Sequence, residues 1–198
     1  DHRHVTSLLH RIETTDIGVL VTPTLSFDER GHQVNHMTYY CVGWSGNGEK
    51  PVDFYPTAED FVGEGGNFER PYAIVKNAEG VKAGTRIEGL EAVGGLHFSE
   101  VTLEPEEECS YLIFTGITED IQEIRNLSKT YTTREMVLEE LEKTKAYWQE
   151  KVNVAYHTGD SDFNQFMHWV SFQPILRRIY GCSFLPVSYT HLRAHETT

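Results

Sequence analysis

Near Thr118 the spacing of apolar residues changes, and the change divides the 198-residue chain into two kinds of structure. Before it, short apolar runs alternate with turn signals rich in Gly, Asn and Asp, which is typical of an antiparallel β-sandwich. After it, apolar residues recur every three or four positions, as they do along helices. The chain is therefore predicted to be a mainly β domain followed by helices.

Several apolar stretches before Thr118 are predicted strands or parts of strands. In residues 35–44 bulky side chains occupy both alternating sets, which indicates a strand buried between two layers. The glycine-rich stretch 63–66 does not lie between a strand and a helix, so it predicts a loop and not a nucleotide site. The predicted strand regions are residues 18–27, 35–44, 72–77, 94–103 and 109–115.

Residues 119–153 are predicted to be a helical linker. Asp120 can cap a short helix, and Thr132 with Glu135 predicts a capping box at the start of a longer one. The longer helix carries one apolar stripe, formed by Leu138, Leu141, Trp148 and Val152.

A third segment begins with Ser161 or Asp162 as a helix start and has almost no polar face. A helix that is apolar nearly all round must be enclosed by other helices, and nothing earlier in the chain supplies them. We therefore expect the first helix of a helical domain whose other helices lie outside these 198 residues. Its apolar residues are Phe163, Phe166, Met167, Trp169, Val170, Phe172, Ile175, Leu176 and Ile179.

Composition and charge limit which binding partners and which cellular compartment are expected. A formal net charge of -13 and a pI near 5.1 would repel a polyphosphate backbone, so no nucleic-acid partner is expected. The three cysteines, Cys41, Cys109 and Cys182, are scattered and form no C-x-x-C, which favours a reducing, cytoplasmic compartment and no metal or redox motif. No apolar run approaches twenty residues, so no membrane span is expected in this chain.

The last residues have a different origin in this interpretation. Residues 187–197 read as the in-frame translation of a common sequencing adapter, and residues 187–198 are therefore predicted to be an adapter-derived tail. The pair His191 and His195 beside Glu196 would otherwise suggest a metal site, and that reading is set aside.

Two stretches resemble glycoside hydrolase family 94. Residues 51–74, PVDFYPTAEDFVGEGGNFERPYAI, look like the loop of that family's N-terminal super-sandwich, and residues 160–173, DSDFNQFMHWVSFQ, look like the opening helix of its six-hairpin α/α barrel. The resemblance implies an antiparallel super-sandwich over 1–118, the linker over 119–153, and a truncated barrel start over 154–186.

The resemblance also implies a reaction. Members of the family related to cellobiose and chitobiose phosphorylases are inverting phosphorylases of β-glucosides. Phosphate is itself the nucleophile, so one carboxylic acid suffices as general acid and no further cofactor is needed. The family's R-D…Q-D stretch and general-acid Asp are expected beyond Leu185, so no catalytic residue is assigned and the fragment alone is expected to be inactive. Its parent is expected to be a homodimer that binds β-linked gluco-oligosaccharide and phosphate.

Two groups of residues are candidates for the site. Arg177 and Arg178 could contact phosphate, because Cys182 stands where relatives often have an Arg, although a surface or linker-contacting role is the simpler interpretation. Asp160 and Asp162 are more simply helix caps than catalytic acids. The loop expected near the cleft, and therefore exposed, is Asn67, Phe68, Glu69 and Arg70.

Two alternative functions stay open. A non-catalytic carbohydrate-binding sandwich would use aromatic residues to stack on sugar, but core packing explains their alternation better; these residues are Tyr39, Tyr40, Trp44 and Phe54. The other is the phosphorylase module of a cyclic β-glucan synthase.

His32 and His36 lie in or beside a strand, where a spacing of four gives only a weak metal signal.

Overall fold

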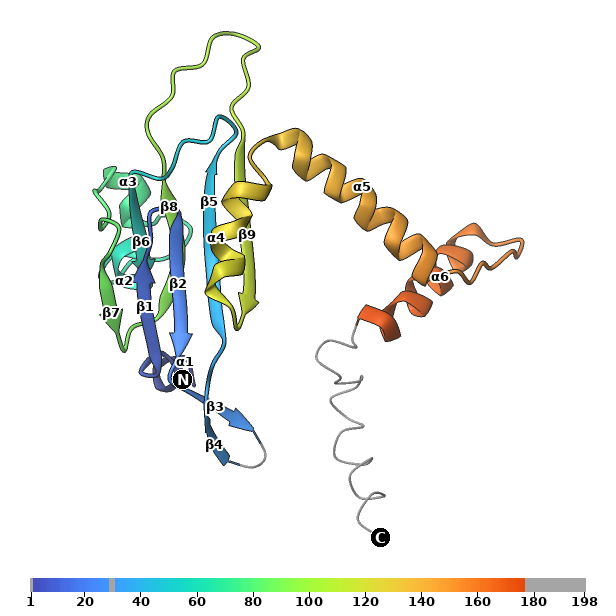
Figure 1. The fold of residues 1–198 in the computed structure, drawn as a ribbon, viewed down its shortest axis with the longest axis horizontal. Coiled ribbons are helices and arrows are strands. Elements are labelled where there is room, and N and C mark those ends of the chain that lie inside the picture. Colours follow the sequence, from blue (N-terminus) through green and yellow to red (C-terminus); the bar gives the residue numbers. More distant parts are fainter. Residues whose placement is uncertain (1, 29–30, 177–198) are drawn as a thin grey trace. The chain divides into compact units, whose positions relative to one another are not determined.

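The computed structural model describes residues 2–28 and 31–176 (Figure 1). The chain divides into two compact units, Asp1–Val137 and Leu138–Thr198. The first unit contains every strand of the described residues, and the second contains most of α5 and all of α6. This agrees with a mainly antiparallel β domain followed by helices.

The first unit is built on a five-stranded antiparallel sheet with the order β7-β1-β2-β5-β9. Strand β5 lies between β2 and β9 and pairs with β9 over eight residues. A short helix, α1 (His2–Ser7), precedes the sheet. The strands are β1 (His10–Thr14), β2 (Gly18–Pro23), β5 (Thr38–Ser45), β7 (Arg86–Glu88) and β9 (Tyr111–Thr118).

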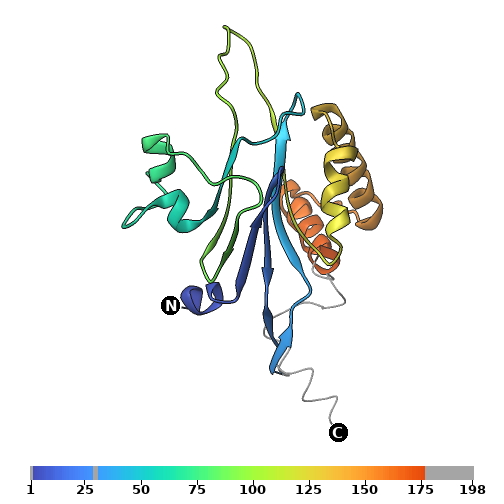
Figure 2. The ribbon, with the colours of Figure 1, turned by 60° about the vertical axis from the view of Figure 1, so that its left-hand side comes forward.

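Two strand pairs complete the β structure. Strands β3 (Leu25–Asp28) and β4 (Gly31–Val34) form a hairpin. Strands β6 (Asp53–Thr57) and β8 (Ala92–His97) pair antiparallel and lie against one face of the five-stranded sheet. Figure 2 shows helix α4 (Ile121–Thr130) on the opposite side of the sheet from β6 and the helices that follow it.

Alternation along the central strands produces two cores, one on each face. On the α4 face, Leu20, Val42, Trp44 and Leu112 pack with Ile124 of α4. On the β8 face, Ile12 and Val19 pack with Phe54 of β6. Successive side chains of a strand point to opposite faces, and Val42 and Trp44 of β5 both lie in the core on the α4 face. The predicted burial of this strand is confirmed for residues 42–45, which are buried, whereas Tyr39 near its start is exposed.

The sequence predicted a strand over residues 72–77, and this prediction is wrong. The segment forms helix α3 (Tyr72–Lys76). Pro71 is the N-cap residue, and Asn77 ends the helix in the left-handed conformation, with φ 46° and ψ 48°. The helix buries only Ala73, while Ile74 and Val75 are exposed. Local turn chemistry at both ends thus overrides the β preference of the Ile-Val pair.

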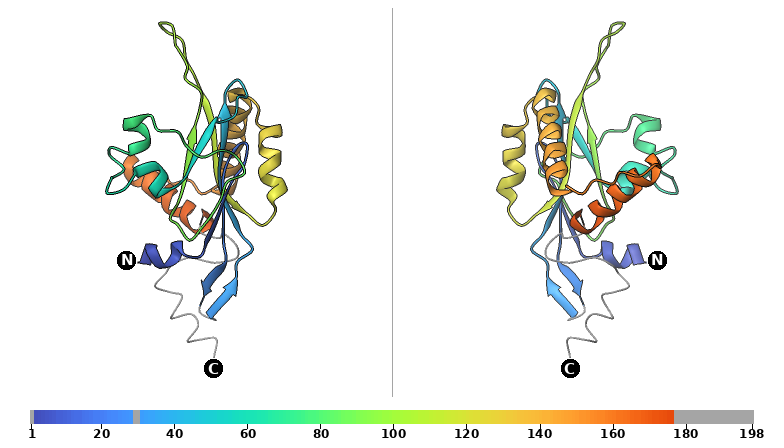
Figure 3. Two further views of the ribbon diagram at one scale, coloured as in Figure 1. Left: turned by 90° about the vertical axis from the view of Figure 1, so that its left-hand side faces the viewer. Right: turned by 90° about the vertical axis from the view of Figure 1, so that its right-hand side faces the viewer.

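The predicted strand over 94–103 is also shorter than expected. Strand β8 ends at His97, and residues 98–110 form an arm that extends past the ends of β8 and β9 (Figure 3). Its tip is a turn closed by a hydrogen bond from the Glu107 N–H to the Glu104 carbonyl, with φ 70° at Glu106. Val101 and Leu103 of the arm are exposed, so no layer covers the region expected to continue the strand.

The two predicted helix starts in the linker had different outcomes. Asp120 caps α4, accepting a 2.8 Å hydrogen bond from the Gln122 N–H, as predicted. The predicted capping box at Thr132 is wrong, because α5 (Arg134–Lys151) begins one residue later than that box requires. The Thr133 hydroxyl accepts from the Met136 N–H at 3.5 Å, while the Thr132 hydroxyl donates to the Met136 sulfur.

In the second unit, Asp160 caps α6 (Ser161–Leu176) by accepting hydrogen bonds from the N–H groups of Asp162 and Phe163, each 3.0 Å. The Trp148 ring meets Phe172 edge-on at a centroid distance of 4.7 Å. Much of the apolar surface of α6 faces solvent, including Phe163, Phe166 and Trp169. Along the predicted α5 stripe, Leu138 and Leu141 are exposed and only Val152, just past α5, is buried.

Candidate functional site

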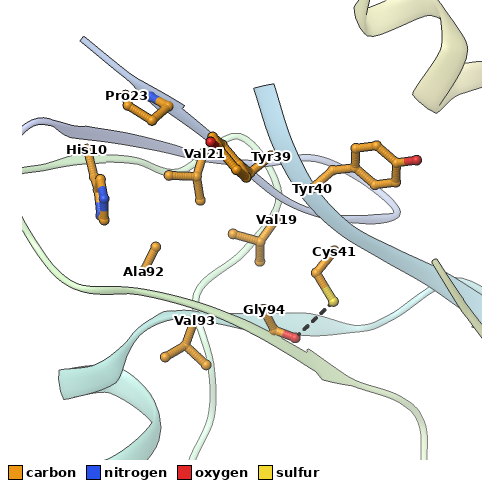
Figure 4. Close-up of a pocket in the computed structure, with 10 residues that line it drawn as sticks. All are labelled: His10, Val19, Val21, Pro23, Tyr39, Tyr40, Cys41, Ala92, Val93 and Gly94. Atoms are coloured by element: carbon orange, nitrogen blue, oxygen red, sulfur yellow. Dashed lines mark hydrogen bonds between the residues drawn. The ribbon is translucent and has the colours of Figure 1, made fainter. Parts of the chain in front are cut away.

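A pocket of about 390 Å³ opens on the β8 face of the first unit (Figure 4). Val19 and Val21 of β2, with Tyr39 and Cys41 of β5, reach it because residues two apart on a strand share a face. The start of β8 forms the facing wall. The remaining lining residues are His10, Pro23, Tyr40, Ala92, Val93 and Gly94.

The chemistry of this pocket favours binding over catalysis. Its lining contains no Asp or Glu, so it holds no carboxylic acid for general-acid work. The Cys41 thiol donates to the Gly94 carbonyl at 3.3 Å, and burial raises the pKa of Cys41, which keeps the sulfur protonated at neutral pH. The Nδ1 atom of His10 is buried and has no hydrogen-bond partner. The pocket therefore offers apolar surface and one unused polar atom.

A buried carboxylate joins β6 to β8. The Asp53 side chain is 4% exposed, and its Oδ1 lies 2.7 Å from Nδ1 of His97, the residue opposite it on β8. The Lys82 ammonium lies 3.8 Å from the other carboxylate oxygen. A buried carboxylate needs such partners, since an unpaired charge in the interior is costly. These contacts explain Asp53 as a structural residue.

Hydrogen bonds to β6, next to Asp53, hold the segment that leads from α3 back to the sheet. Val81 and Phe54 exchange two backbone hydrogen bonds of 2.8 and 2.9 Å, and the Tyr55 hydroxyl donates to the Ala78 carbonyl. The pKa of Tyr55 is raised by burial and by the nearby Asp53 carboxylate, so the hydroxyl remains a donor at neutral pH. The segment after α3 is thereby anchored on β6.

The candidate loop Asn67–Arg70 lies between α2 (Ala58–Val62) and α3. Its conformation is set by Asn67, whose side-chain oxygen accepts from the N–H groups of Glu69 and Arg70, each at 3.0 Å. Phe68 is 64% exposed, and its ring lies 6.3 Å from that of Phe61. All four loop residues are exposed, as expected for a surface loop. Their place near a cleft stays a prediction.

The other candidates belong to the second unit, Leu138–Thr198. Arg177, Arg178, Cys182 and the tail 187–198 lie outside the described residues. Asp160 acts as a helix cap, which agrees with its simpler interpretation, and Asp162 lies in the first turn of α6.

The aromatic residues divide between core and surface. Trp44 and Phe54 are buried in the two cores, and Tyr40 packs against the α4 core, as the alternation predicted. Tyr39 differs, because it is 46% exposed and lines the pocket on the β8 face. Of these four aromatic residues, Tyr39 is the one for which the expectation of core packing was wrong.

Within residues 2–28 and 31–176, no group of three or more His, Cys, Asp or Glu side chains is arranged to hold a metal ion. His36 is exposed, and the side chain of His32 is outside what the structure describes. None of the described helices is long and apolar enough to cross a membrane.

Together the two cores and the antiparallel sheets define a β-sandwich domain followed by helices. The chain belongs to glycosyl hydrolase family 94, because the model of "Glycosyl hydrolase 94, supersandwich domain" matches residues 2–134. That match includes α4, whose Ile124 is packed in the sandwich core. A search of curated proteins gave no significant match. The domain boundaries at 118, 153 and 186 stay predictions.

Proposed function

We propose that the chain is a fragment of an inverting phosphorylase that cleaves β-glucosidic bonds with inorganic phosphate. The observation that carries the proposal is the family 94 supersandwich match over residues 2–134. In the reaction, a phosphate oxygen attacks the anomeric carbon and the glycosidic C–O bond breaks. A carboxylic acid gives its proton to the leaving oxygen, and the product is a sugar 1-phosphate of inverted configuration.

We propose further that these 198 residues do not catalyse this reaction alone. The R-D…Q-D stretch of the family has no counterpart in the chain, which contains neither an Arg-Asp nor a Gln-Asp pair. Asp160, a carboxylate near the predicted barrel start, is engaged by two backbone N–H groups. The proposal therefore assigns the general acid to other parts of the parent protein.

In this proposal the first unit is a scaffold that presents a loop to the catalytic cleft of the parent. Asn67 holds the loop by two hydrogen bonds, which leaves Phe68, Glu69 and Arg70 free to contact a ligand. Arg177 and Arg178 are proposed phosphate contacts. The parent is proposed to be a cytoplasmic homodimer that uses phosphate as co-substrate, with no other cofactor and no nucleic-acid partner.

The test uses the protein encoded by the complete gene, beside the 198-residue chain. The parent should release glucose 1-phosphate from a β-linked glucose disaccharide only when phosphate is present, and the short chain should release none. Hydrolysis without phosphate by the parent would contradict the phosphorylase assignment. Phosphorolysis by the short chain would contradict the assignment of the acid to other parts of the protein.

A carbohydrate-binding module is a second candidate, supported by exposed Tyr39 and the unpartnered His10 nitrogen, which line the same pocket. Aromatic rings stack on the apolar faces of sugars, and polar atoms fix their orientation. Calorimetry of the short chain with a β-linked glucose tetrasaccharide tests it. Binding that is lost in Tyr39→Ala and kept in Tyr72→Ala, a change at another exposed tyrosine, would favour this candidate.

A further inference from the structure

A pocket of about 650 Å³ lies within the second unit, between the C-terminal end of α5 and helix α6. We call it the α5–α6 pocket; its walls come from α5, from the segment that follows it and from α6. None of the described residues that line it is Asp, Glu, Lys or Arg. An uncharged ligand is therefore better suited to this pocket than an ionic one, because an ion would lose its hydration there without gaining a counter-charge.

Aromatic rings form the apolar part of the α5–α6 pocket. The Phe172 ring meets Trp148 edge-on at a centroid distance of 4.7 Å. It also stacks on Trp169, with 5.5 Å between the ring centroids and 29° between the ring planes. Trp169 is 57% exposed, so much of its indole surface is open to a ligand. The pocket thus offers a broad flat apolar surface.

Polar side chains without a carboxylate, ammonium or guanidinium group stand beside the rings. Gln149 of α5, with Gln165 and His168 of α6, lines the pocket and is exposed, as the other two are. Amide and imidazole groups supply both hydrogen-bond donors and acceptors. A pyranose ring has flat faces of C–H bonds and hydroxyl groups around its edge, so this combination matches the chemistry of a neutral sugar.

Hydrogen bonds hold the segment after α5 against α6. The Asn164 side-chain oxygen accepts from the Thr158 N–H at 3.0 Å, and its NH₂ group donates to the Thr158 carbonyl at 3.2 Å. The hydroxyls of Tyr156 and Ser171 lie 3.1 Å apart. Walls that are fixed before a ligand arrives lose less conformational freedom when it binds, which favours affinity.

The α5–α6 pocket is on a different side of α6 from its purely apolar face. Phe163, Phe166 and Val170 are three and four positions apart, so they share one face, and all three are exposed. By the helical period, His168 and Phe172 of the pocket lie on the opposite side. A further helix packed on the apolar face would therefore leave the pocket open.

We propose that the α5–α6 pocket binds a neutral pyranose saccharide. One sugar ring stacks on Trp169, and its hydroxyl groups bond to Gln149, Gln165 and His168. The choice of a β-linked glucose oligosaccharide as probe rests on the proposed function. Binding is measured on the 198-residue chain and needs no catalysis, so its failure is distinguishable from a failure of phosphorolysis by the parent.

The indole N–H signals in the nuclear magnetic resonance spectrum of the ¹⁵N-labelled chain test the site directly. A β-linked glucose tetrasaccharide should shift the signals of Trp148 and Trp169 saturably. It should leave that of Trp44, whose Nε1–H is bonded to the Tyr131 carbonyl, in place. Inorganic phosphate should shift none of them. Unmoved Trp148 and Trp169 signals at about 10 mM saccharide, tenfold above a Kd of about 1 mM, or equal shifts with phosphate, would overturn the proposal.

A matched pair of ring deletions on α6 gives a second test. Trp169→Ala removes a ring that is 57% exposed in the pocket, and Phe166→Ala removes one that is 60% exposed on the apolar face. Calorimetry should show saccharide binding about tenfold weaker in Trp169→Ala and unchanged in Phe166→Ala. Equal weakening by the two deletions, or binding that is lost in Tyr39→Ala and kept in Trp169→Ala, would contradict the assignment to this pocket.

A third variant keeps the test decisive if Trp169→Ala disturbs the helix. Gln165→Ala leaves every ring in place and should weaken binding about threefold, through the loss of one hydrogen bond, with unchanged circular dichroism. Saccharide affinity equal to that of the unsubstituted chain would remove Gln165 from the site and overturn the proposed arrangement.

Discussion

The sandwich and helix α6 use the same kinds of side chain in opposite surroundings. In the sandwich, Val42 is 0% exposed and Phe54 is 1% exposed. On α6, Phe166 is 60% exposed and Trp169 is 57% exposed. The first unit packs a core on each face of its sheet, whereas α6 has apolar residues on more faces than the described part of the second unit covers.

This difference indicates where the stability of the chain resides. Burial of a large apolar side chain contributes about 1.5–3 kcal/mol relative to leaving it exposed. The sandwich gains that contribution at Phe54, Trp44 and Val42, and α6 gains little of it at Phe166 or Trp169. The sandwich is therefore expected to unfold as the stable unit, and α6 to respond weakly to changes on its exposed faces.

The largest expected effect comes from truncating a phenylalanine in each region. Phe54→Ala removes a fully buried ring and should lower the free energy of unfolding of the sandwich by about 3–5 kcal/mol. Phe166→Ala removes an exposed ring and should change it by less than about 0.5 kcal/mol. Urea denaturation followed by circular dichroism measures both. Equal losses of unfolding free energy in the two variants would contradict the contrast between the two regions, because they would show that Phe166 is enclosed in solution.

A smaller effect is expected from a tryptophan in each region. The Trp44 Nε1–H donates to the Tyr131 carbonyl at 2.9 Å, so Trp44→Phe leaves that carbonyl without its partner and should cost about 1–3 kcal/mol. Trp169→Phe should cost less than about 0.5 kcal/mol.

Fluorescence quenching sharpens this second comparison. A variant that keeps only Trp44 should resist quenching by acrylamide, whereas one that keeps only Trp169 should be strongly quenched, because the first ring is 3% exposed. A Trp169 as well shielded as Trp44 would contradict the view that α6 is an unenclosed helix.

The smallest effect is expected at the helix caps. Asp120→Ala should destabilise the sandwich by about 1 kcal/mol, since α4 packs its Ile124 into the core. Asp160→Ala removes the corresponding hydrogen bonds of α6 and should lower helicity while leaving the urea midpoint of Trp44 fluorescence unchanged.

Conservative variants serve as controls for the caps, because Asn caps a helix about as well as Asp. Asp120→Asn and Asp160→Asn should therefore both resemble the unsubstituted chain. A shift of the urea midpoint of Trp44 fluorescence by Asp160→Ala would mean that α6 stabilises the first unit. That result would contradict the expectation that the sandwich is stable without α6.

The fold class was readable from the sequence because it depends on the period of apolar residues. The strong alternation of β5 and the capped, periodic pattern of α4 both correspond to elements of the structure. Strands β1, β4, β6 and β7 were missed. Strand β6 contains Pro56 at a shift of register, and β7 has three residues, two of them charged, so neither gives a periodic signal.

The candidate site was less predictable. The exposure of residues 67–70 was expected from the resemblance to family 94, which implies a loop near the cleft at this place in the sequence. The pocket was not expected, because it forms where β8 crosses β2 and β5, and a sequence pattern does not state which distant strands meet. The same reason hid the pair of Asp53 and His97, which are 44 residues apart in sequence.

The sequence by itself determined the mainly β class, the helices that follow, and the cap at Asp120, because these depend on neighbouring residues and their spacing. Only the tertiary structure decided which face of β5 meets α4, why Asp53 can be buried, and which strands line the pocket. Those features depend on the order of strands in the sheet, which is set by the free energy of packing the whole chain and not by any one segment.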